Sequence, residues 1–406
     1  MRTQPIYSLV LNDDGRMLLQ PTHFTWDESG QTHTALWRAA VSPQPASLEV
    51  ADDTLSADKA YKLLQSGACL LWRGDFHNGR QLLQALGRRL DKKPRVKTPK
   101  AKSAAASTDK ATIAYEAFKQ HRADQARRHN MLARVLLQFE PDYSLALRRA
   151  PNAQLALTEA WGEPVGAACI ASFKDLQGMV GAHEWRKKGV DIPFLGGRIH
   201  PHYAVYSPLR GEYIDLIATA PLPSGAQALA FDIGTGSGVI AAVLAKRGVR
   251  RVVATDLEPR AITCATDNLQ RLKLAGQVEV VAADLFPIGQ APLIVCNPPW
   301  LPTPVSNTIE RAVYDPDSAM LRGFLSGLGA HLTPEGEGWL ILSDLAEHLG
   351  LRTRDELMAW IGAAGLRVVK RHDTRPTHPK SKDATDPLFI ARSQEVTSLW
   401  RLAHSA

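Results

Sequence analysis

This sequence contains few cysteines and no long apolar run, and each absence excludes a class of protein. The cysteines are Cys69, Cys169, Cys264 and Cys296. None belongs to a Cys-x-x-Cys pair or has histidines at metal-ligand spacing, which favours reduced thiols and argues against structural zinc. No stretch approaches the roughly 18 apolar residues that a membrane-spanning helix needs. The patch Ile6–Leu11 is short and runs into two aspartates, so we expect no secretory signal and a cytoplasmic protein without a bound metal.

The excess of basic over acidic residues in the chain comes from one stretch. The formal net charge is +7 over 406 residues, a length typical of about two to three domains. Between Arg88 and Lys102, eight basic residues face a single acid, whereas from Pro201 onward 20 Lys and Arg face 21 Asp and Glu. The basic stretch continues into a run of Ser, Thr and Ala, so we interpret residues 89–108 as a basic flexible linker. Such a linker is either a solvated tether or an arm that touches a polyanion such as RNA.

The first half of the chain is predicted to hold two modules. Residues 1–88 are expected to form a small α+β module of unknown role, with a hairpin at 6–20 and helices at Ser56–Leu64 and Gly79–Leu86. Residues 109–199 are expected to be a mostly helical substrate-recognition region. Its first helix would begin at Asp109, carry Val135 and Leu136 on an apolar stripe and end near Pro141.

Residues 200–406 alternate between strand and helix patterns. Strands are expected at 228–233, 251–256, 278–282, 293–296, 339–342, 366–371 and 388–392, and helices at 239–246, 259–274, 318–331 and 353–363. This alternation predicts an α/β fold with a mainly parallel, doubly wound sheet. Ligands of such sheets bind beyond the carboxyl ends of the strands, and Asp232, Asp256, Asp284 and Asn297 all fall at such ends.

The turn Gly234–Gly238 after the first of these strands favours S-adenosylmethionine over a dinucleotide. The dinucleotide pattern requires a third glycine at position 239, which is Val. Asp232 would repel a pyrophosphate but attract the ammonium group of S-adenosylmethionine. Asp256 can accept hydrogen bonds from both ribose hydroxyls, and Asp284 can accept one from the adenine amino group. We therefore predict S-adenosyl-L-methionine as the cofactor.

The sequence Asn297-Pro298-Pro299-Trp300 provides the strongest chemical signal. The two prolines donate no backbone hydrogen bond, so the Asn297 side-chain oxygen and the Pro298 carbonyl can together accept both hydrogens of a planar amino group. Trp300 offers a flat face against which an amide or a base can stack. Holding both N–H bonds favours a pyramidal nitrogen whose lone pair points at the sulfonium methyl. The pattern indicates methyl transfer to a planar nitrogen without a general base.

At these residues the chain resembles the class I S-adenosylmethionine-dependent methyltransferases, and among them the HemK-type (N5-glutamine) enzymes and their relatives that modify exocyclic amines of rRNA or DNA. The resemblance covers roughly residues 200–345 and rests on Asp232–Ala241, Thr255–Leu257, Ala283–Phe286 and Asn297–Trp300. It implies a Rossmann-like sheet with an antiparallel last strand, in a methyltransferase domain over 200–406.

The same resemblance implies a role for each site residue. The methionine part of the cofactor would be held by Asp232, Gly234, Thr235, Gly236 and Gly238, the ribose by Asp256 and the adenine by Asp284. The acceptor nitrogen would be held by Asn297, Pro298 and Trp300, with Asn297 also close to the cofactor. The glutamine-specific enzymes usually have Tyr at the position of Trp300, and Trp also occurs in relatives that act on nucleic acids.

Three functions therefore stay open, in this order. The first is an N-methyltransferase for a protein glutamine amide in a translation-related protein, which the near-neutral charge from Pro201 onward favours. The second is an rRNA, tRNA or DNA methyltransferase for the N6 amine of adenine or the N2 amine of guanine, with Arg88–Lys102 contacting the polyanion. The third is a non-catalytic binding module that keeps the methyltransferase fold.

Overall fold

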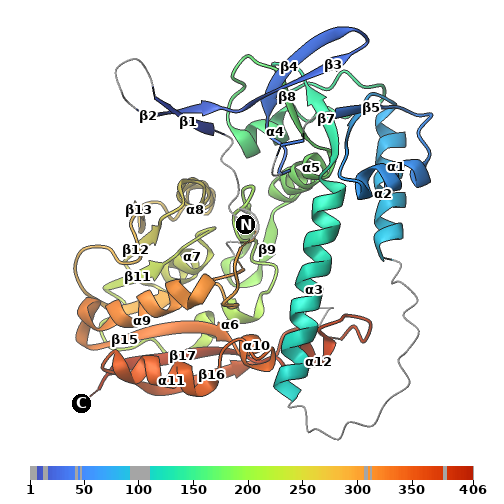
Figure 1. The fold of residues 1–406 in the computed structure, drawn as a ribbon. Coiled ribbons are helices and arrows are strands. Elements are labelled where there is room, and N and C mark those ends of the chain that lie inside the picture. Colours follow the sequence, from blue (N-terminus) through green and yellow to red (C-terminus); the bar gives the residue numbers. More distant parts are fainter. Residues whose placement is uncertain are drawn as a thin grey trace, which may run out of the picture. The chain divides into compact units, whose positions relative to one another are not determined.

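The computed structural model describes residues 7–11, 17–41, 44–45, 48–91, 110–305, 310, 313–377 and 382–405 (Figure 1). The chain forms two compact units, the first from residues 1–106 and 122–184 and the second from residues 107–121 and 185–406. These units divide the chain differently from the expected segments 1–88, 89–108, 109–199 and 200–406. Most of the expected linker and of the basic arm, and the turn of the expected hairpin, lie outside the described residues.

The described residues of the first unit form a six-stranded sheet in the order β3-β4-β8-β7-β6-β5. Its strands are β3 (His23–Glu28), β4 (Gln31–Trp37), β5 (Leu48–Ala51), β6 (Cys69–Trp72), β7 (Val135–Phe139) and β8 (Cys169–Ser172). A separate antiparallel pair joins β1 (Tyr7–Leu11) to β2 (Met17–Pro21). The helices of this unit are α1 (Ala57–Gln65), α2 (Phe76–Asp91), α4 (Gln154–Trp161) and most of α5 (Phe173–Lys188).

The helix predicted to run from Asp109 to near Pro141 is shorter in the structure. Helix α3 (Lys110–Leu132) ends earlier, and Val135 and Leu136 belong to β7, where both side chains are fully buried. The prediction was wrong because a short, mostly apolar run such as Val135–Phe139 fits a helix or a central strand equally well. Here β7 pairs with β6 along one edge and with β8 along the other, and its side chains are buried on both faces of the sheet.

The second unit is a seven-stranded mixed sheet over its described residues, in the order β13-β12-β11-β14-β15-β17-β16. Its strands are β11 (Leu229–Ile233), β12 (Arg251–Asp256), β13 (Val278–Ala282), β14 (Ala291–Cys296), β15 (Leu332–Ser343), β16 (Leu366–Thr374) and β17 (Thr397–His404). Strands β11 to β15 pair in parallel, and β17 is antiparallel to both neighbours. This is the predicted Rossmann-like α/β fold with an antiparallel last strand.

Helices cover both faces of this sheet. The helices of this unit include the first part of α3 (Lys110–Leu132), α6 (Glu212–Thr219), α7 (Val239–Lys246), α8 (Pro259–Arg271), α9 (Ala319–His331), α10 (Leu345–His348), α11 (Arg354–Ala363) and α12 (Phe389–Gln394). A short pair, β9 (Val190–Ile192) and β10 (Gly197–Ile199), precedes α6. Successive residues of β11 point into hydrophobic cores on opposite faces of the sheet. Ala230 packs in the core that contains α6 and α7, and Phe231 packs in the core that contains α9 and α11. Figure 1 shows α9 and α11 beside the sheet.

Most elements of this unit match their predicted ranges, with one clear error. The ranges of α7, β12 and β13 agree at both ends with the prediction. The strand predicted at 388–392 is instead part of helix α12, and the last strand is β17. Segment 388–392 is only five residues long, too short for its periodicity to separate strand from helix.

Three further observations concern the cysteines, membrane-spanning helices and metal-binding groups. The four cysteines, all in the described part of the chain, are buried and form no disulfide. No helix among the described residues is long and apolar enough to cross a membrane. The same residues contain no group of three or more His, Cys, Asp or Glu side chains arranged to bind a metal ion.

Candidate active site

A cavity of about 750 Å³ lies at the carboxyl ends of the parallel strands in the second unit. Its wall contains Gly234–Ser237 after β11, Asp256 at the end of β12 and Asn297–Leu301 after β14. Asp284, just past β13, also lines it and is exposed. Because parallel strands end at one edge of a sheet, four segments distant in sequence meet here. The structure thus brings Gly234, Thr235, Gly236, Asp256, Asp284, Asn297, Pro298 and Trp300 together in the wall of one cavity.

The loop between β11 and α7 depends on glycine at three positions. Gly234, Gly236 and Gly238 have φ values of 69°, 55° and 80°, a region that side chains disfavour. A Cβ on Gly234 would collide with the Met320 side chain, and one on Gly238 would lie 3.1 Å from the Cα of Ala265. The loop therefore lets α7 start close to α8 and keeps its own backbone free to approach a ligand.

Asp232 lies behind this loop and supports it. The side chain is fully buried, and its Oδ2 accepts hydrogen bonds from the Thr235 hydroxyl at 2.6 Å and the Ala241 amide at 3.0 Å. Oδ1 has no hydrogen-bond partner among the described residues. Burial raises the pKa of Asp232 to about 7, although the Thr235 bond acts in the opposite direction. Asp232 and Gly238 are not among the described residues that line the cavity, and the expected contact between Asp232 and the cofactor stays a prediction.

Asp256 connects two segments of the cavity wall. Its Oδ2 accepts a hydrogen bond from the Gly236 amide and its Oδ1 one from the Glu258 amide, both at 3.0 Å. Burial raises the pKa of this carboxyl above its ordinary value, while these backbone hydrogen bonds lower it. A carboxylate has about four acceptor positions, so both oxygens keep capacity for a ligand diol.

The Asn297–Trp300 segment is more tightly organised than the sequence suggested. The indole Nε1–H of Trp300 donates a hydrogen bond to Oδ1 of Asn297 at 2.8 Å. The guanidinium carbon of Arg210 lies over the Trp300 ring, 4.9 Å from its centroid. The sequence predicted a flat Trp300 face open to an acceptor. In the structure the Arg210 guanidinium lies over this ring.

Arg210 and Asp315 are among the residues of the wall that sequence reasoning missed. Asp315 is 5% exposed, and its two oxygens accept hydrogen bonds from the Met320 and Leu321 amides at the start of α9. Asp317 and Ser318, two and three positions after Asp315, have φ values of 56° and 52°, which is strained backbone beside the cavity. Segments 206–212 and 314–318 resemble the methyltransferase pattern only loosely, so neither residue was among the predicted site residues.

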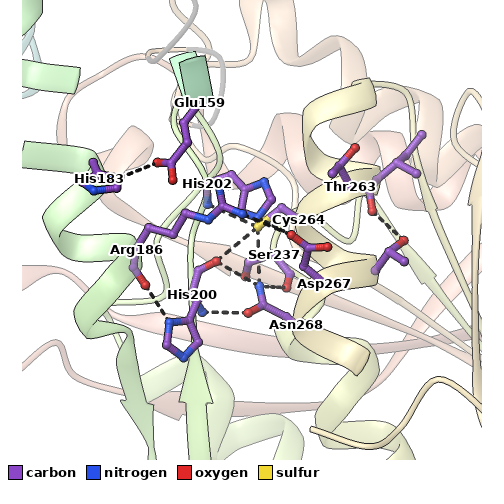
Figure 2. A network of polar contacts seen from close by, with 12 residues as sticks. Glu159, His183, Arg186, His200, His202, Ser237, Thr263, Cys264, Asp267 and Asn268 are labelled. Atoms are coloured by element: carbon purple, nitrogen blue, oxygen red, sulfur yellow. Dashed lines mark hydrogen bonds and ion pairs between the residues drawn. The ribbon is translucent and has the colours of Figure 1, made fainter. Parts of the chain in front are cut away.

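A polar network attaches helix α8 to the segment that leads into the cavity wall (Figure 2). Asn268 accepts a hydrogen bond from the His200 amide at 2.7 Å, and its Nδ2 donates to the Ser237 carbonyl at 3.1 Å. On the same helix, Asp267 pairs with His202 at 3.0 Å and with Arg186 at 3.2 Å. These contacts join the glycine loop to the chain that continues into the wall residues 204–206.

Comparison with known proteins agrees with this geometry. Residues 222–313 match the family described as ribosomal protein L11 methyltransferase (PrmA). A release factor glutamine methyltransferase from Thermosynechococcus vestitus is 30% identical over 227 residues, which cover 50% of this chain and 72% of the relative. The chain belongs to the class I S-adenosylmethionine-dependent methyltransferases. Other class I methyltransferases match over a smaller part of their length.

Two such relatives have different acceptors. A ribosomal protein L11 methyltransferase from Pelotomaculum thermopropionicum is 32% identical over 33% of this chain and 42% of its own length. A tRNA1(Val) (adenine(37)-N6)-methyltransferase from Pedobacter heparinus is 31% identical over 30% of this chain and 57% of its own length. This chain thus spans about half the length of either relative.

The cavity fits S-adenosylmethionine, the methyl donor of the class I methyltransferases. Its volume lies within the range of small-molecule and cofactor sites. At Gly236, which lines the cavity, an added Cβ would have no neighbouring atom within 4 Å, so the space beside the loop backbone is open to a ligand. Asp256 presents carboxylate oxygens that suit a ribose diol.

Proposed function

We propose that this protein transfers a methyl group from S-adenosylmethionine to a planar amino nitrogen, and that the acceptor is the side-chain amide of a glutamine in a translation-related protein. The observation that carries this proposal is the placement of the Gly234–Ser237 loop and the Asn297–Trp300 segment in the wall of one cavity. A cofactor on the first segment and an acceptor on the second would share a single enclosed space.

The proposed chemistry follows from the hydrogen-bonding capacity of Asn297 and Pro298. Trp300 uses one acceptor position of the Asn297 oxygen, so a second stays available for an N–H of the acceptor. The Pro298 carbonyl can accept the other N–H. Holding both hydrogens in this way draws the nitrogen lone pair out of conjugation and aims it at the methyl group.

The transfer balances without a general base. S-adenosylmethionine supplies an electrophilic methyl group on a sulfonium. A bond forms between the acceptor nitrogen and the methyl carbon as the carbon–sulfur bond breaks, leaving a neutral thioether. The methylated nitrogen is then strongly acidic and releases its proton to water.

Charge and similarity support glutamine as the acceptor. The segment from Pro201 onward is nearly neutral, whereas enzymes that act on nucleic acids usually line their clefts with Lys and Arg. The relative that this chain covers most fully among those compared above is a release factor glutamine methyltransferase. An exocyclic amine of a nucleic-acid base is the second candidate, favoured by Trp300 and by the similarity to the tRNA adenine methyltransferase.

One labelling experiment separates these acceptors. The full chain would be incubated with methyl-labelled S-adenosylmethionine and a bacterial cell extract, and the products treated with protease or nuclease. We expect protease to release the label and nuclease to leave it in place. Methylation of a Gln-containing peptide, lost when that Gln is replaced by Ala, would then identify the acceptor atom.

The remaining outcomes decide against glutamine. Label released by nuclease, with a rate that falls steeply as salt increases, would assign the activity to a nucleic acid. Calorimetry that detects no S-adenosylmethionine binding would leave only the third function, a non-catalytic binding module.

A further inference from the structure

Arg210, in the cavity wall, is hydrogen-bonded to two buried glutamates. Its Nε donates to Glu212 at 2.8 Å and its Nη2 donates to Glu395 at 2.9 Å. The two glutamate side chains are 5% and 4% exposed, and the arginine side chain is 21% exposed. Glu395 also accepts a hydrogen bond from the Ser343 hydroxyl at 2.6 Å. Two buried carboxylates therefore bind one guanidinium, each through a different nitrogen.

Stability alone is a poor explanation for this arrangement. Burying charged side chains costs desolvation free energy, and the attraction between the opposite charges often only offsets that cost. A protein with apolar residues of similar size in their place is frequently as stable. The fixed direction of the guanidinium is the property that apolar residues would not provide. Glu395 and Glu212 also raise the pKa of Arg210 in opposition to burial, so the cation is kept.

The guanidinium then fixes the ring on which it lies. Arg210 covers the Trp300 ring at 4.9 Å from its centroid, a distance at which cation and ring attract each other. At the edge of the ring, the Trp300 Nε1–H is bonded to Asn297. An indole N–H is a donor only, so its partner has to be the oxygen of the Asn297 amide. The contacts thus run in sequence from Glu395 through Arg210 and Trp300 to Asn297.

We propose that Arg210 is a positioning residue for methyl transfer. Held by Glu212 and Glu395, it keeps the Trp300 indole in the orientation that directs the Asn297 oxygen toward the acceptor nitrogen. This inference rests on the proposed function, because it concerns the placement of the acceptor and not the binding of the cofactor.

The test compares Arg210→Met with a matched control. Arg371→Met also removes an arginine that lies over a tryptophan, 5.1 Å from the Trp400 ring centroid, and pairs with a carboxylate, but Arg371 is not part of the cavity wall. We expect Arg210→Met to lower the rate at saturating S-adenosylmethionine about 100-fold, the scale expected of a misplaced reacting group. Cofactor affinity should change by less than about twofold, and the control should match wild type.

A double-variant cycle tests whether Arg210 acts through Asn297. Adding Asn297→Ala to Arg210→Met should lower the rate little beyond the lower of the two single variants, because both changes affect one step. Full multiplication of the two effects would overturn the proposal, as would a normal rate for Arg210→Met. If Arg210→Met fails to fold, Glu395→Gln provides the same test with the shape of the cluster kept.

A spectroscopic measurement keeps this inference separate from the proposed function. In ¹⁵N-labelled protein, the indole N–H signal of Trp300, identified by its loss in Trp300→Phe, should shift in Arg210→Met and stay in place in Arg371→Met. A shift without methyl transfer to any acceptor by the wild type would defeat the proposed function while confirming the contact. An unchanged Trp300 signal in Arg210→Met would overturn the positioning role directly.

Discussion

Oδ2 of Asp256 accepts a hydrogen bond from the Gly236 amide at 3.0 Å, and this contact joins the segments that follow two neighbouring strands. Both residues line the cavity, so the carboxylate orders the glycine loop and faces the ligand space at the same time. The acceptor segment contributes nothing to this contact. Cofactor binding and methyl transfer should therefore respond to different substitutions.

The first prediction concerns Asp256. Asp256→Ala removes both the acceptor for the Gly236 amide and the carboxylate proposed to bind the ribose. We expect the affinity for S-adenosylmethionine, measured by calorimetry, to fall about 10- to 100-fold, the effect of losing hydrogen bonds to a charged group. Asp355→Ala, an exposed position on helix α11 outside the cavity wall, serves as the control. Unchanged affinity in Asp256→Ala would place the ribose elsewhere.

Asn297→Ala should show the opposite behaviour. The substitution removes the oxygen that receives the Trp300 N–H and, in our proposal, one N–H of the acceptor. We expect cofactor affinity close to that of the wild type and a rate reduced by about 100-fold or more, by analogy with the loss of one group that stabilises a transition state. Calorimetry and a methyl-incorporation assay on the same protein measure both quantities. Normal turnover would show that the acceptor is bound elsewhere.

The third prediction separates two reasons for glycine in the loop after β11. Gly236 and Gly238 both have positive φ, but only at Gly238 would a Cβ meet neighbouring atoms, those of Ala265. Gly236→Ala should destabilise the protein by about 1–2 kcal/mol, the strain of a left-handed alanine. Gly238→Ala should cost more, because α7 and α8 must also separate. Urea unfolding of both variants gives the comparison, and equal losses would contradict it.

Local pattern was sufficient to predict the strand ends of the second unit but not the contacts between side chains. Asp256 and Asn297 both line the cavity because each stands at the carboxyl end of a buried strand of a parallel sheet, a position that the sequence pattern predicts. The bond between Arg210 and Glu395 joins residues 185 positions apart, and no local spacing indicates such a pair. The Trp300–Asn297 bond depends on side-chain rotamers, which the sequence does not specify.

The burial of Asp232 has a similar explanation. Its position at the end of β11 was predicted, but the side of the loop on which its carboxylate lies follows from the bonds to Thr235 and Ala241. The error over Val135 had another cause, since one partner of β7, strand β6, lies in the part of the chain that was assigned to a different module.

The last prediction concerns Asp232 and pH. Burial raises the pKa of this carboxyl from about 3.8 to about 7 in the native protein. Between these values the native side chain keeps a proton that the unfolded chain has lost. Rising pH then lowers the free energy of unfolding, by about 1.4 kcal/mol for each pH unit, and the loss ends above about pH 7.

Asp232→Asn has no such proton, so this part of the pH dependence should be absent from it. Urea unfolding of the cofactor-free proteins at pH 5, 6, 7 and 8 measures the difference between the two. We expect the wild type to lose stability relative to Asp232→Asn up to about pH 7 and to run parallel to it above; parallel behaviour over the whole range would show that the native carboxyl titrates normally.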